Sequence, residues 1–259
     1  MVCVYDSGVG GLTALAALRR VAPACDVIYF GDTARVPYGV RDPATVCRYT
    51  REVLGYLSAY SPAAVLVACG TVSTVVLPTW RGCCSFPVLG VAEAGVRAAA
   101  ASSPKRVAVL GTEATVRSGY FAELLRTALP QAEVTSLACP LFVALAEAGY
   151  TSPDDPIARV AVETILSPLL LHPPEAILLG CTHFPWLSVH IARLFPEATL
   201  VDCGAAAVRE LAPLLACEVG EGRTEYLVTD GVDAFRRAAY RVTGASVGGE
   251  IRMVKLPEE

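Results

Sequence analysis

The chain has 259 residues, enough for one large domain or two of about 130, and 54% of its residues are hydrophobic. Gly, Pro, Ser or charged residues interrupt every apolar stretch before the roughly 18 residues that a membrane span needs, and no basic start precedes an apolar segment as in a signal peptide. The net charge of −4 argues against nucleic acid as the main ligand, so we expect a globular cytoplasmic protein without a membrane segment.

Strands and helices alternate along the first part of the chain. A glycine-rich turn, residues 6–11, separates the first strand from the first helix, and its free backbone N–H groups suit an anion. It is not a dinucleotide fingerprint, because Thr13 stands where the third glycine would be, and it lacks the Gly-Lys-Ser/Thr of a P-loop. The expected strands are 2–5, 27–30, 64–68 and 87–91, and the expected helices are 12–21, 42–60, 93–101 and one that starts near 73.

The remainder of the chain repeats this organisation. Alternating strands and helices predict parallel sheets covered on both faces, and two similar halves predict two Rossmann-like, doubly wound α/β domains with a cleft between them. The expected strands are 107–110, 133–137, 176–179, 199–202 and 224–228, and the expected helices are 113–129, 141–148, 154–171, 185–195, 205–217 and 230–241.

Two of the ten cysteines occupy matching positions in the two halves. In a chain of this length without a secretion signal, we expect reduced thiols, most of them small core residues. Cys69 and Cys181, however, each follow a buried apolar strand and precede a helix, and the carboxyl ends of strands are where open α/β sheets place their ligands. We therefore expect one site with a thiol from each half.

Two opposed thiols suit a reaction that removes a proton from one face of a carbon and returns one to the other face. A free thiol has a pKa of about 8.5, and a helix N-terminus or a neighbouring base increases its thiolate fraction. Asp6, His183 and Glu147 are candidates to hold or relay protons, while hydroxyls and turn amides would bind a carboxylate and an ammonium. Taken singly, each Ser, Thr or Asp at a helix start is explained by capping.

Seven motifs, in register from residue 1 to about 204, resemble glutamate racemases of the aspartate/glutamate racemase family. They are DSGVGG from Asp6, YFGD from Tyr29, PYG from Pro37, VACGT from Val67, GTEAT from Gly111, CPLFV from Cys139 and GCTH from Gly180. The resemblance implies cofactor-independent interconversion of L- and D-glutamate by two cysteines, which supplies D-glutamate for peptidoglycan. It also implies a homodimer and a C-terminal segment that returns to the first domain, giving domains of 1–93 plus 205–259 and 94–204.

The motif match also assigns the site. Cys69 and Cys181 are the acid/base pair, and Asp6, Glu147 and His183 assist them. The motif match predicts no metal. The substrate-binding residues would be Asp6, Ser7, Pro37, Tyr38, Gly39, Gly70, Thr71, Thr112, Thr115 and Thr182.

Gly70 departs from the family pattern, in which the corresponding residue is usually Asn. Loss of one aligned hydrogen-bond donor from a closed site costs about 10²–10³-fold in rate, although a glycine leaves room for a water in its place. Two alternatives follow: an amino-acid-binding or gyrase-interacting homologue with weak turnover, or a related aspartate racemase.

A zinc site is a third alternative. Asp6, Cys69, Cys181 and His183 form a chemically suitable tetrahedral set, although their scattered positions lack the spacing of structural zinc motifs. The two other histidines, His172 and His190, are expected to be solvated and inert.

Overall fold

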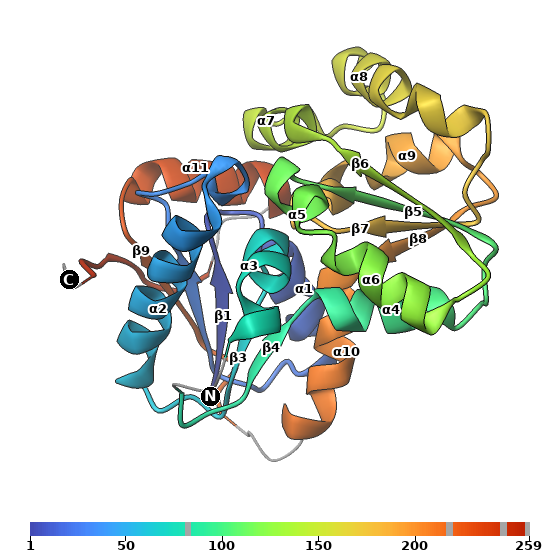
Figure 1. Cartoon of the computed structure of the whole chain (residues 1–259). Coiled ribbons are helices and arrows are strands. Elements are labelled where there is room, and N and C mark those ends of the chain that lie inside the picture. Colours follow the sequence, from blue (N-terminus) through green and yellow to red (C-terminus); the bar gives the residue numbers. More distant parts are fainter. Residues whose placement is uncertain (81–83, 216–219, 244–247, 257–259) are drawn as a thin grey trace.

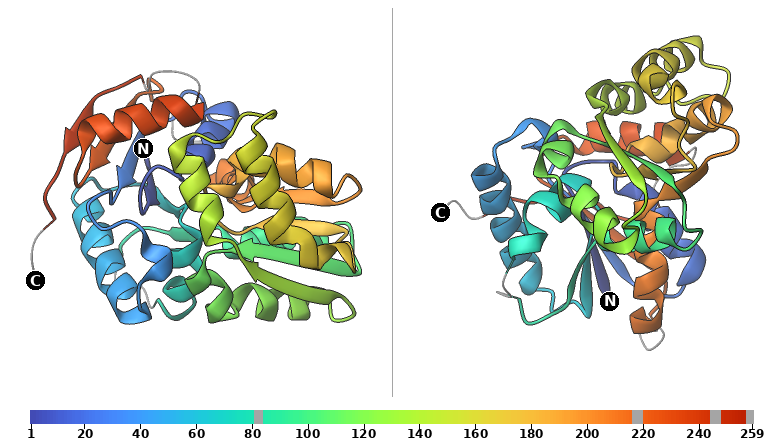
Figure 2. Two further views of the ribbon diagram at one scale, coloured as in Figure 1. Left: turned by 90° about the horizontal axis from the view of Figure 1, so that it is seen from above. Right: turned by 45° about the vertical axis from the view of Figure 1, so that its right-hand side comes forward.

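Two parallel β-sheets organise the chain, as the alternation of strands and helices predicts (Figure 1). The computed structural model describes residues 1–80, 84–215, 220–243 and 248–256. In both views of Figure 2 the green and yellow segments lie in one half of the molecule, and the blue, cyan and red segments lie in the other. The α/β prediction with two sheets is therefore confirmed.

The first sheet contains six strands among the described residues, all paired in parallel. Its central strands are runs of β-branched and aromatic residues with both faces buried, which is the composition expected for a covered parallel sheet. In spatial order the strands are β10 (Ile251–Met253), β9 (Thr224–Val228), β2 (Val27–Gly31), β1 (Val2–Asp6), β3 (Ala64–Val67) and β4 (Val88–Gly90).

The second sheet has four strands in the described part of the chain, again all parallel. In spatial order they are β6 (Glu133–Ala138), β5 (Arg106–Gly111), β7 (Ala176–Leu179) and β8 (Thr199–Asp202). Both sheets reverse their strand order at the same place, between β1 and β3 in the first and between β5 and β7 in the second. Loops diverge at such a switch point and leave a crevice at the carboxyl ends of the strands.

Helices cover the sheets and join the two halves. Two of them begin with an aspartate cap: Asp42 accepts a hydrogen bond from Thr45 N at the start of α2, and Asp155 accepts from Ile157 N and Ala158 N at the start of α8. The helices are α1 (Leu12–Val21), α2 (Pro43–Ser58), α3 (Gly70–Val75), α4 (Ala92–Ala100), α5 (Glu113–Ser118), α6 (Tyr120–Ala128), α7 (Pro140–Ala148), α8 (Pro156–Leu166), α9 (Ser188–Leu194), α10 (Cys203–Leu215) and α11 (Val232–Thr243), with 3₁₀ turns at Tyr38–Val40, Leu77–Thr79, Ser167–Leu170 and Phe184–Leu187.

Three predicted helix boundaries were wrong, and one strand was not predicted. The helix expected over 113–129 is two helices, because Gly119 adopts φ +69° and ends α5. The helix expected over 154–171 ends at Leu166 and continues as a 3₁₀ turn that contains a proline. The helix after Cys69 starts at Gly70 rather than near 73, and the three-residue edge strand β10 was not predicted. The expected end of the helix over 205–217 lies outside the described residues.

The first sheet takes its strands from both ends of the chain. Its strands come from 2–90 and 224–253, whereas the second sheet uses 106–202. We propose domain boundaries of 1–93 plus 205–259 and 94–204 on this basis.

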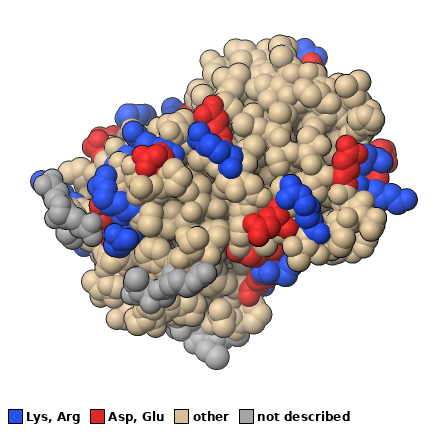
Figure 3. All heavy atoms as spheres, viewed as in Figure 1, with Lys and Arg blue, Asp and Glu red and all other residues tan. Residues whose placement is uncertain are grey.

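Two surface properties bear on the partners considered above. Within the described ranges, no helix is both long and apolar enough to cross a membrane. On the face drawn in Figure 3, Lys and Arg side chains are interspersed with Asp and Glu. This mixed face lacks the single-sign field that nucleic-acid binding uses.

Candidate active site

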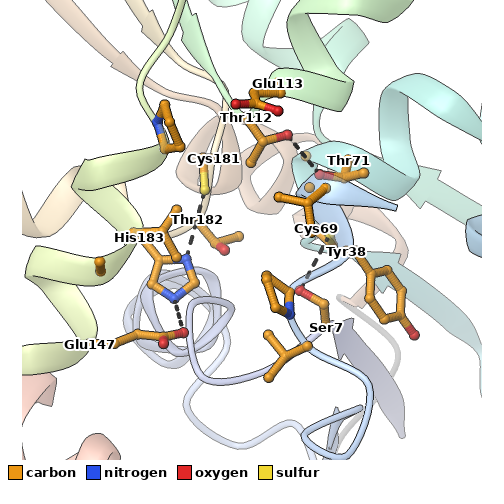
Figure 4. Close-up of a pocket in the computed structure, with 18 residues that line it drawn as sticks. Ser7, Tyr38, Cys69, Thr71, Thr112, Glu113, Glu147, Cys181, Thr182 and His183 are labelled. Atoms are coloured by element: carbon orange, nitrogen blue, oxygen red, sulfur yellow. Dashed lines mark hydrogen bonds and ion pairs between the residues drawn. The ribbon is translucent and has the colours of Figure 1, made fainter. Parts of the chain in front are cut away.

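A pocket opens where the carboxyl ends of the central strands of both sheets meet (Figure 4). Its volume of about 240 Å³ is below the 300–1,000 Å³ typical of drug-sized ligands, so it suits a molecule of amino-acid size. The lining side chains come from both halves: Ser7, Val36, Pro37, Tyr38, Gly39, Val40, Cys69, Gly70, Thr71, Thr112, Glu113, Pro140, Val143, Ala144, Glu147, Cys181, Thr182 and His183.

Cys69 lies just after β3 and immediately before α3. Only 5% of the residue is exposed, and its Sγ lies 3.7 Å from Ser7 Oγ, to which it donates a hydrogen bond. Burial, reinforced by the Asp6 carboxylate, raises the pKa of the Cys69 thiol to about 12. In the free protein this thiol is therefore protonated at neutral pH and able to act as an acid.

Cys181 occupies the corresponding position after β7 and has a basic neighbour. Its Sγ lies 3.7 Å from Nδ1 of His183, whose Nε2 donates to Oε1 of Glu147 over 3.0 Å. Burial lowers the pKa of His183, but the contacts with Cys181 and Glu147 outweigh burial and raise this pKa to about 10. His183 is therefore an imidazolium at neutral pH, and its positive charge lies beside the Cys181 sulfur.

The two thiols lie on opposite walls of the pocket (Figure 4). On one wall the Cys69 thiol is protonated, and on the other wall the His183–Glu147 pair lies beside Cys181. An arrangement of one acid and one base across a cavity can exchange a proton on both faces of a carbon held between them.

Asp6 is close to the pocket without lining it. The carboxylate is fully buried at the end of β1, where it accepts hydrogen bonds from Gly8 N at 3.0 Å and from Thr182 Oγ1 at 3.3 Å. Burial raises the pKa of Asp6, and the nearby His183 opposes this shift. The position suits a group that orients Thr182 and the charge of His183 from behind the wall.

A line of hydroxyls joins the two halves at one end of the pocket. Thr71 Oγ1 and Thr112 Oγ1 lie 3.0 Å apart, on α3 and at the start of α5 respectively. Thr112 also donates to Thr115 Oγ1 over 3.0 Å and accepts from Thr115 N. Thr115 is buried behind Thr112 and supports it rather than lining the pocket.

The Pro37-Tyr38-Gly39 segment forms another wall of the pocket, and hydrogen bonds on the side away from the pocket fix the Tyr38 side chain. The Tyr38 hydroxyl donates to the buried Asp32 carboxylate and accepts from Tyr5 over 3.1 Å, and Arg35 Nε binds Asp32 at 2.7 Å. The ring therefore faces the cavity while its polar group is satisfied inside the protein. The sequence motif identified Tyr38 as a site residue but did not indicate where its hydroxyl points.

Gly70 lines the pocket and packs against Gly180 of the other half. A Cβ built on it would lie 1.9 Å from the carbonyl oxygen of Gly180, far inside van der Waals contact. An Asn at this position, as in the family pattern, therefore does not fit this arrangement of the two halves without movement.

Sequence reasoning missed part of the lining. Pro140 and Val143 belong to the CPLFV motif, and Glu113 belongs to GTEAT, so these motifs were the available signal. Val36, Val40 and Ala144 are ordinary apolar residues that only the tertiary structure brings to the cavity.

Two of the sequence hypotheses find no support. No group of three or more His, Cys, Asp or Glu side chains suited to a metal occurs in the part of the chain that the structure describes, so the zinc alternative is not supported. His190 was expected to be solvated but is 3% exposed, because α9 packs it toward the loop before α8, where Nε2 contacts the Ser152 carbonyl at 3.0 Å. His172 is exposed as expected.

Comparison with known proteins gives matches over nearly the whole chain. Residues 13–211 match the sequence profile described as Asp/Glu/Hydantoin racemase. The glutamate racemase of Geobacter metallireducens is 40% identical over 99% of this chain and 97% of its own length. The crystal structure of the Bacillus anthracis glutamate racemase isoform RacE1 superposes with a TM-score of 0.92 at 29% identity, covering 100% of this chain and 98% of that one. The Francisella tularensis glutamate racemase in complex with D-glutamate gives a TM-score of 0.87 at 29% identity, with 98% and 97% coverage.

Proposed function

Because this chain belongs to the Asp/Glu/Hydantoin racemase family, we propose that it interconverts L- and D-glutamate by a two-thiol mechanism without a cofactor. The single observation that carries the proposal is the pair of buried cysteines on opposite walls of one amino-acid-sized pocket, each at the carboxyl end of a switch-point strand.

The reaction needs one base and one acid. A thiolate on one wall removes the α-proton from one face of the bound glutamate and becomes a thiol, leaving a carbanion at Cα. The thiol on the opposite wall then gives its proton to the other face and becomes a thiolate. The product is the enantiomer, the protonation states of the two cysteines are exchanged, and the reverse reaction begins from that state.

In the free site, one of the two groups is already in the state that the reaction needs. Burial keeps the Cys69 thiol protonated and ready to act as the acid, and on the opposite wall the charged His183 lies 3.7 Å from Cys181 Sγ. Ser7, Thr71, Thr112 and Thr182 supply hydroxyls around the cavity that suit the carboxylates and ammonium of glutamate. Glu147, behind His183, provides the compensating negative charge.

The alternatives are less well supported. The relatives compared above are glutamate racemases over nearly their full lengths, which favours glutamate over aspartate. The thiols, histidine and carboxylate needed for turnover are all present around the pocket, which favours an enzyme over a glutamate-binding or gyrase-interacting homologue despite Gly70.

The test is α-proton exchange followed by NMR. L-Glutamate and, separately, D-glutamate are incubated in D₂O with the wild type, Cys69→Ala and Cys181→Ala. We expect the wild type to exchange the α-proton of both enantiomers and racemise them, and each variant to lose at least about 10²-fold in racemisation rate, since each removes an acid/base group.

Cys47→Ala is the matched control, because Cys47 is a half-buried cysteine on α2 that does not line the pocket. If the wild type leaves both enantiomers unexchanged while calorimetry shows glutamate binding, the enzyme proposal is refuted and a binding protein takes its place.

We further propose that the protein is a cytoplasmic homodimer and that its D-glutamate is used for peptidoglycan. These proposals rest on the family. Light scattering coupled to size-exclusion chromatography tests the first: a mass of twice 27.2 kDa is expected, and the monomer mass contradicts it.

A further inference from the structure

Two glycines meet between the two cysteine-bearing loops. Gly70 follows Cys69, and Gly180 precedes Cys181. A Cβ on Gly70 would meet the Gly180 carbonyl oxygen at 1.9 Å, the Gly180 carbonyl carbon at 3.0 Å and Cys181 Cα at 3.6 Å. Ordinary van der Waals contact begins near 3.4 Å, so a side chain at position 70 requires the loops to separate by about 1.5 Å.

The atoms that would be displaced are backbone atoms held in place on both sides. Gly180 N donates to Leu110 O at 2.8 Å, which fixes the residue to β5. On the other side, the Gly70 carbonyl accepts from Thr74 Oγ1 at 2.9 Å within α3. Unlike the end of a flexible side chain, neither group can rotate away, so movement has to occur between the halves.

The next residue, Thr71, also contacts the other half of the molecule. Thr71 Oγ1 lies 3.0 Å from Thr112 Oγ1, so the hydrogen bond that joins α3 to α5 depends on the same separation. Any residue larger than glycine at position 70 would therefore lengthen this hydrogen bond as well as move Cys69 away from Cys181.

We propose that Gly70 is a positioning residue that sets the separation of the two cysteine-bearing loops, so that both thiols reach the Cα of one bound glutamate. The proposal rests on the two-thiol function proposed above. In a two-base reaction both sulfurs have to reach the same Cα, so the rate depends on the separation of the loops. A misplacement of about 1 Å costs on the order of 10²-fold in rate.

The test compares Gly70→Ala and Gly70→Asn with Gly55→Ala. Gly55 is an exposed glycine of α2, and a Cβ added to it would have nothing within 4 Å, so it is the matched control. For Gly70→Ala we expect kcat to fall about 10²-fold, both from L- to D-glutamate and from D- to L-glutamate, with a smaller change in KM. For Gly70→Asn we expect kcat to fall at least as far. Gly55→Ala should keep the wild-type values.

A second readout is independent of turnover. The rate of alkylation by iodoacetamide is measured at each cysteine by peptide mass spectrometry. In Gly70→Ala, we expect alkylation at Cys69 and Cys181 to be several-fold faster than in the wild type, because the loops are held apart. Cys3 and Cys203, which are 0% and 1% exposed and do not line the pocket, should remain unreactive.

Several outcomes would overturn the proposal. The first is a wild-type or higher kcat in either Gly70 variant. The second is a fall in kcat without faster alkylation at Cys69 and Cys181. The third is loss of the folded structure in Gly70→Ala, seen as unfolding or as faster alkylation at Cys3 and Cys203. The last result would show that Gly70 maintains the fold rather than the separation. If the wild type does not racemise glutamate at all, the proposed function fails, and the alkylation rates still decide whether Gly70 sets the separation.

Discussion

At the scale of single residues, the positive charge of His183 beside Cys181 depends on Glu147. This carboxylate accepts the Nε2 proton of His183 at 3.0 Å, and its side chain is 40% exposed. Replacement by the neutral Gln removes one of the groups that raise the pKa of His183. We expect Glu147→Gln to lower kcat about 10-fold and to move the alkaline limb of the kcat–pH profile toward neutral pH. An unshifted profile would show that Glu147 does not hold the proton of His183.

The same histidine makes stability depend on pH. Its pKa is raised from 6.5 to about 10 in the folded protein, so its contribution to the free energy of unfolding is fully present below pH 6.5 and is lost as pH rises toward 10. Because Glu147 is partly screened by solvent, we expect a loss of about 1–2 kcal/mol over this range. Urea unfolding at pH 6 and pH 10 measures it, and His183→Asn should show a smaller decrease than the wild type.

At the scale of elements, two glycines should respond in opposite directions to the same change. Gly119 ends α5 with φ +69°, where an L-residue is strained, whereas Gly55 lies in the interior of α2 with open space around it. We expect Gly119→Ala to lower the free energy of unfolding by about 1 kcal/mol and Gly55→Ala to raise it by roughly 0.5–1 kcal/mol. Urea unfolding of both variants measures the two changes in the free energy of unfolding. An increase for Gly119→Ala would contradict the prediction.

The cap of α5 provides a second comparison. Thr112 Oγ1 accepts from Thr115 N and also lies 3.0 Å from Thr71 Oγ1. Thr112→Ala removes both interactions and should cost about 1 kcal/mol in the free energy of unfolding, together with part of kcat/KM. Thr112→Ser keeps the hydroxyl and should retain both quantities. Equal losses in the two variants would attribute the effect to the methyl group, which packs near Gly39.

The elements also show what local pattern can and cannot predict. Cys69 and Cys181 were placed at strand ends correctly, because buried parallel strands are continuous apolar runs and their ends are marked by polar residues. The division at Gly119 was missed because a lone glycine is tolerated inside a helical pattern. The hydrogen bond from Tyr38 to Asp32 and the contact between Gly70 and Gly180 depend on how distant elements pack, which no periodicity encodes.

At the scale of the whole molecule, a ligand between the two halves should stabilise both. The pocket takes side chains from strand ends of both sheets, and a ligand at 100 times its Kd adds about 2.7 kcal/mol to the free energy of unfolding. We expect D-glutamate to raise Tm by roughly 5–10 °C at that concentration, with sodium chloride at equal ionic strength as the control. No increase beyond that of the salt would show that the pocket does not bind glutamate.

The pairing of β2 with β9 has a consequence for the newly made chain. Val27 pairs with Thr224, so during synthesis β2 remains an open sheet edge while residues 32–228 are made, a stretch that includes the whole four-stranded sheet. At ~5–20 residues per second, this interval is roughly 10–40 s. An exposed edge strand is a template for pairing with other chains. The nascent protein is therefore most prone to aggregate on the ribosome, and the arrival of its last strands ends that period.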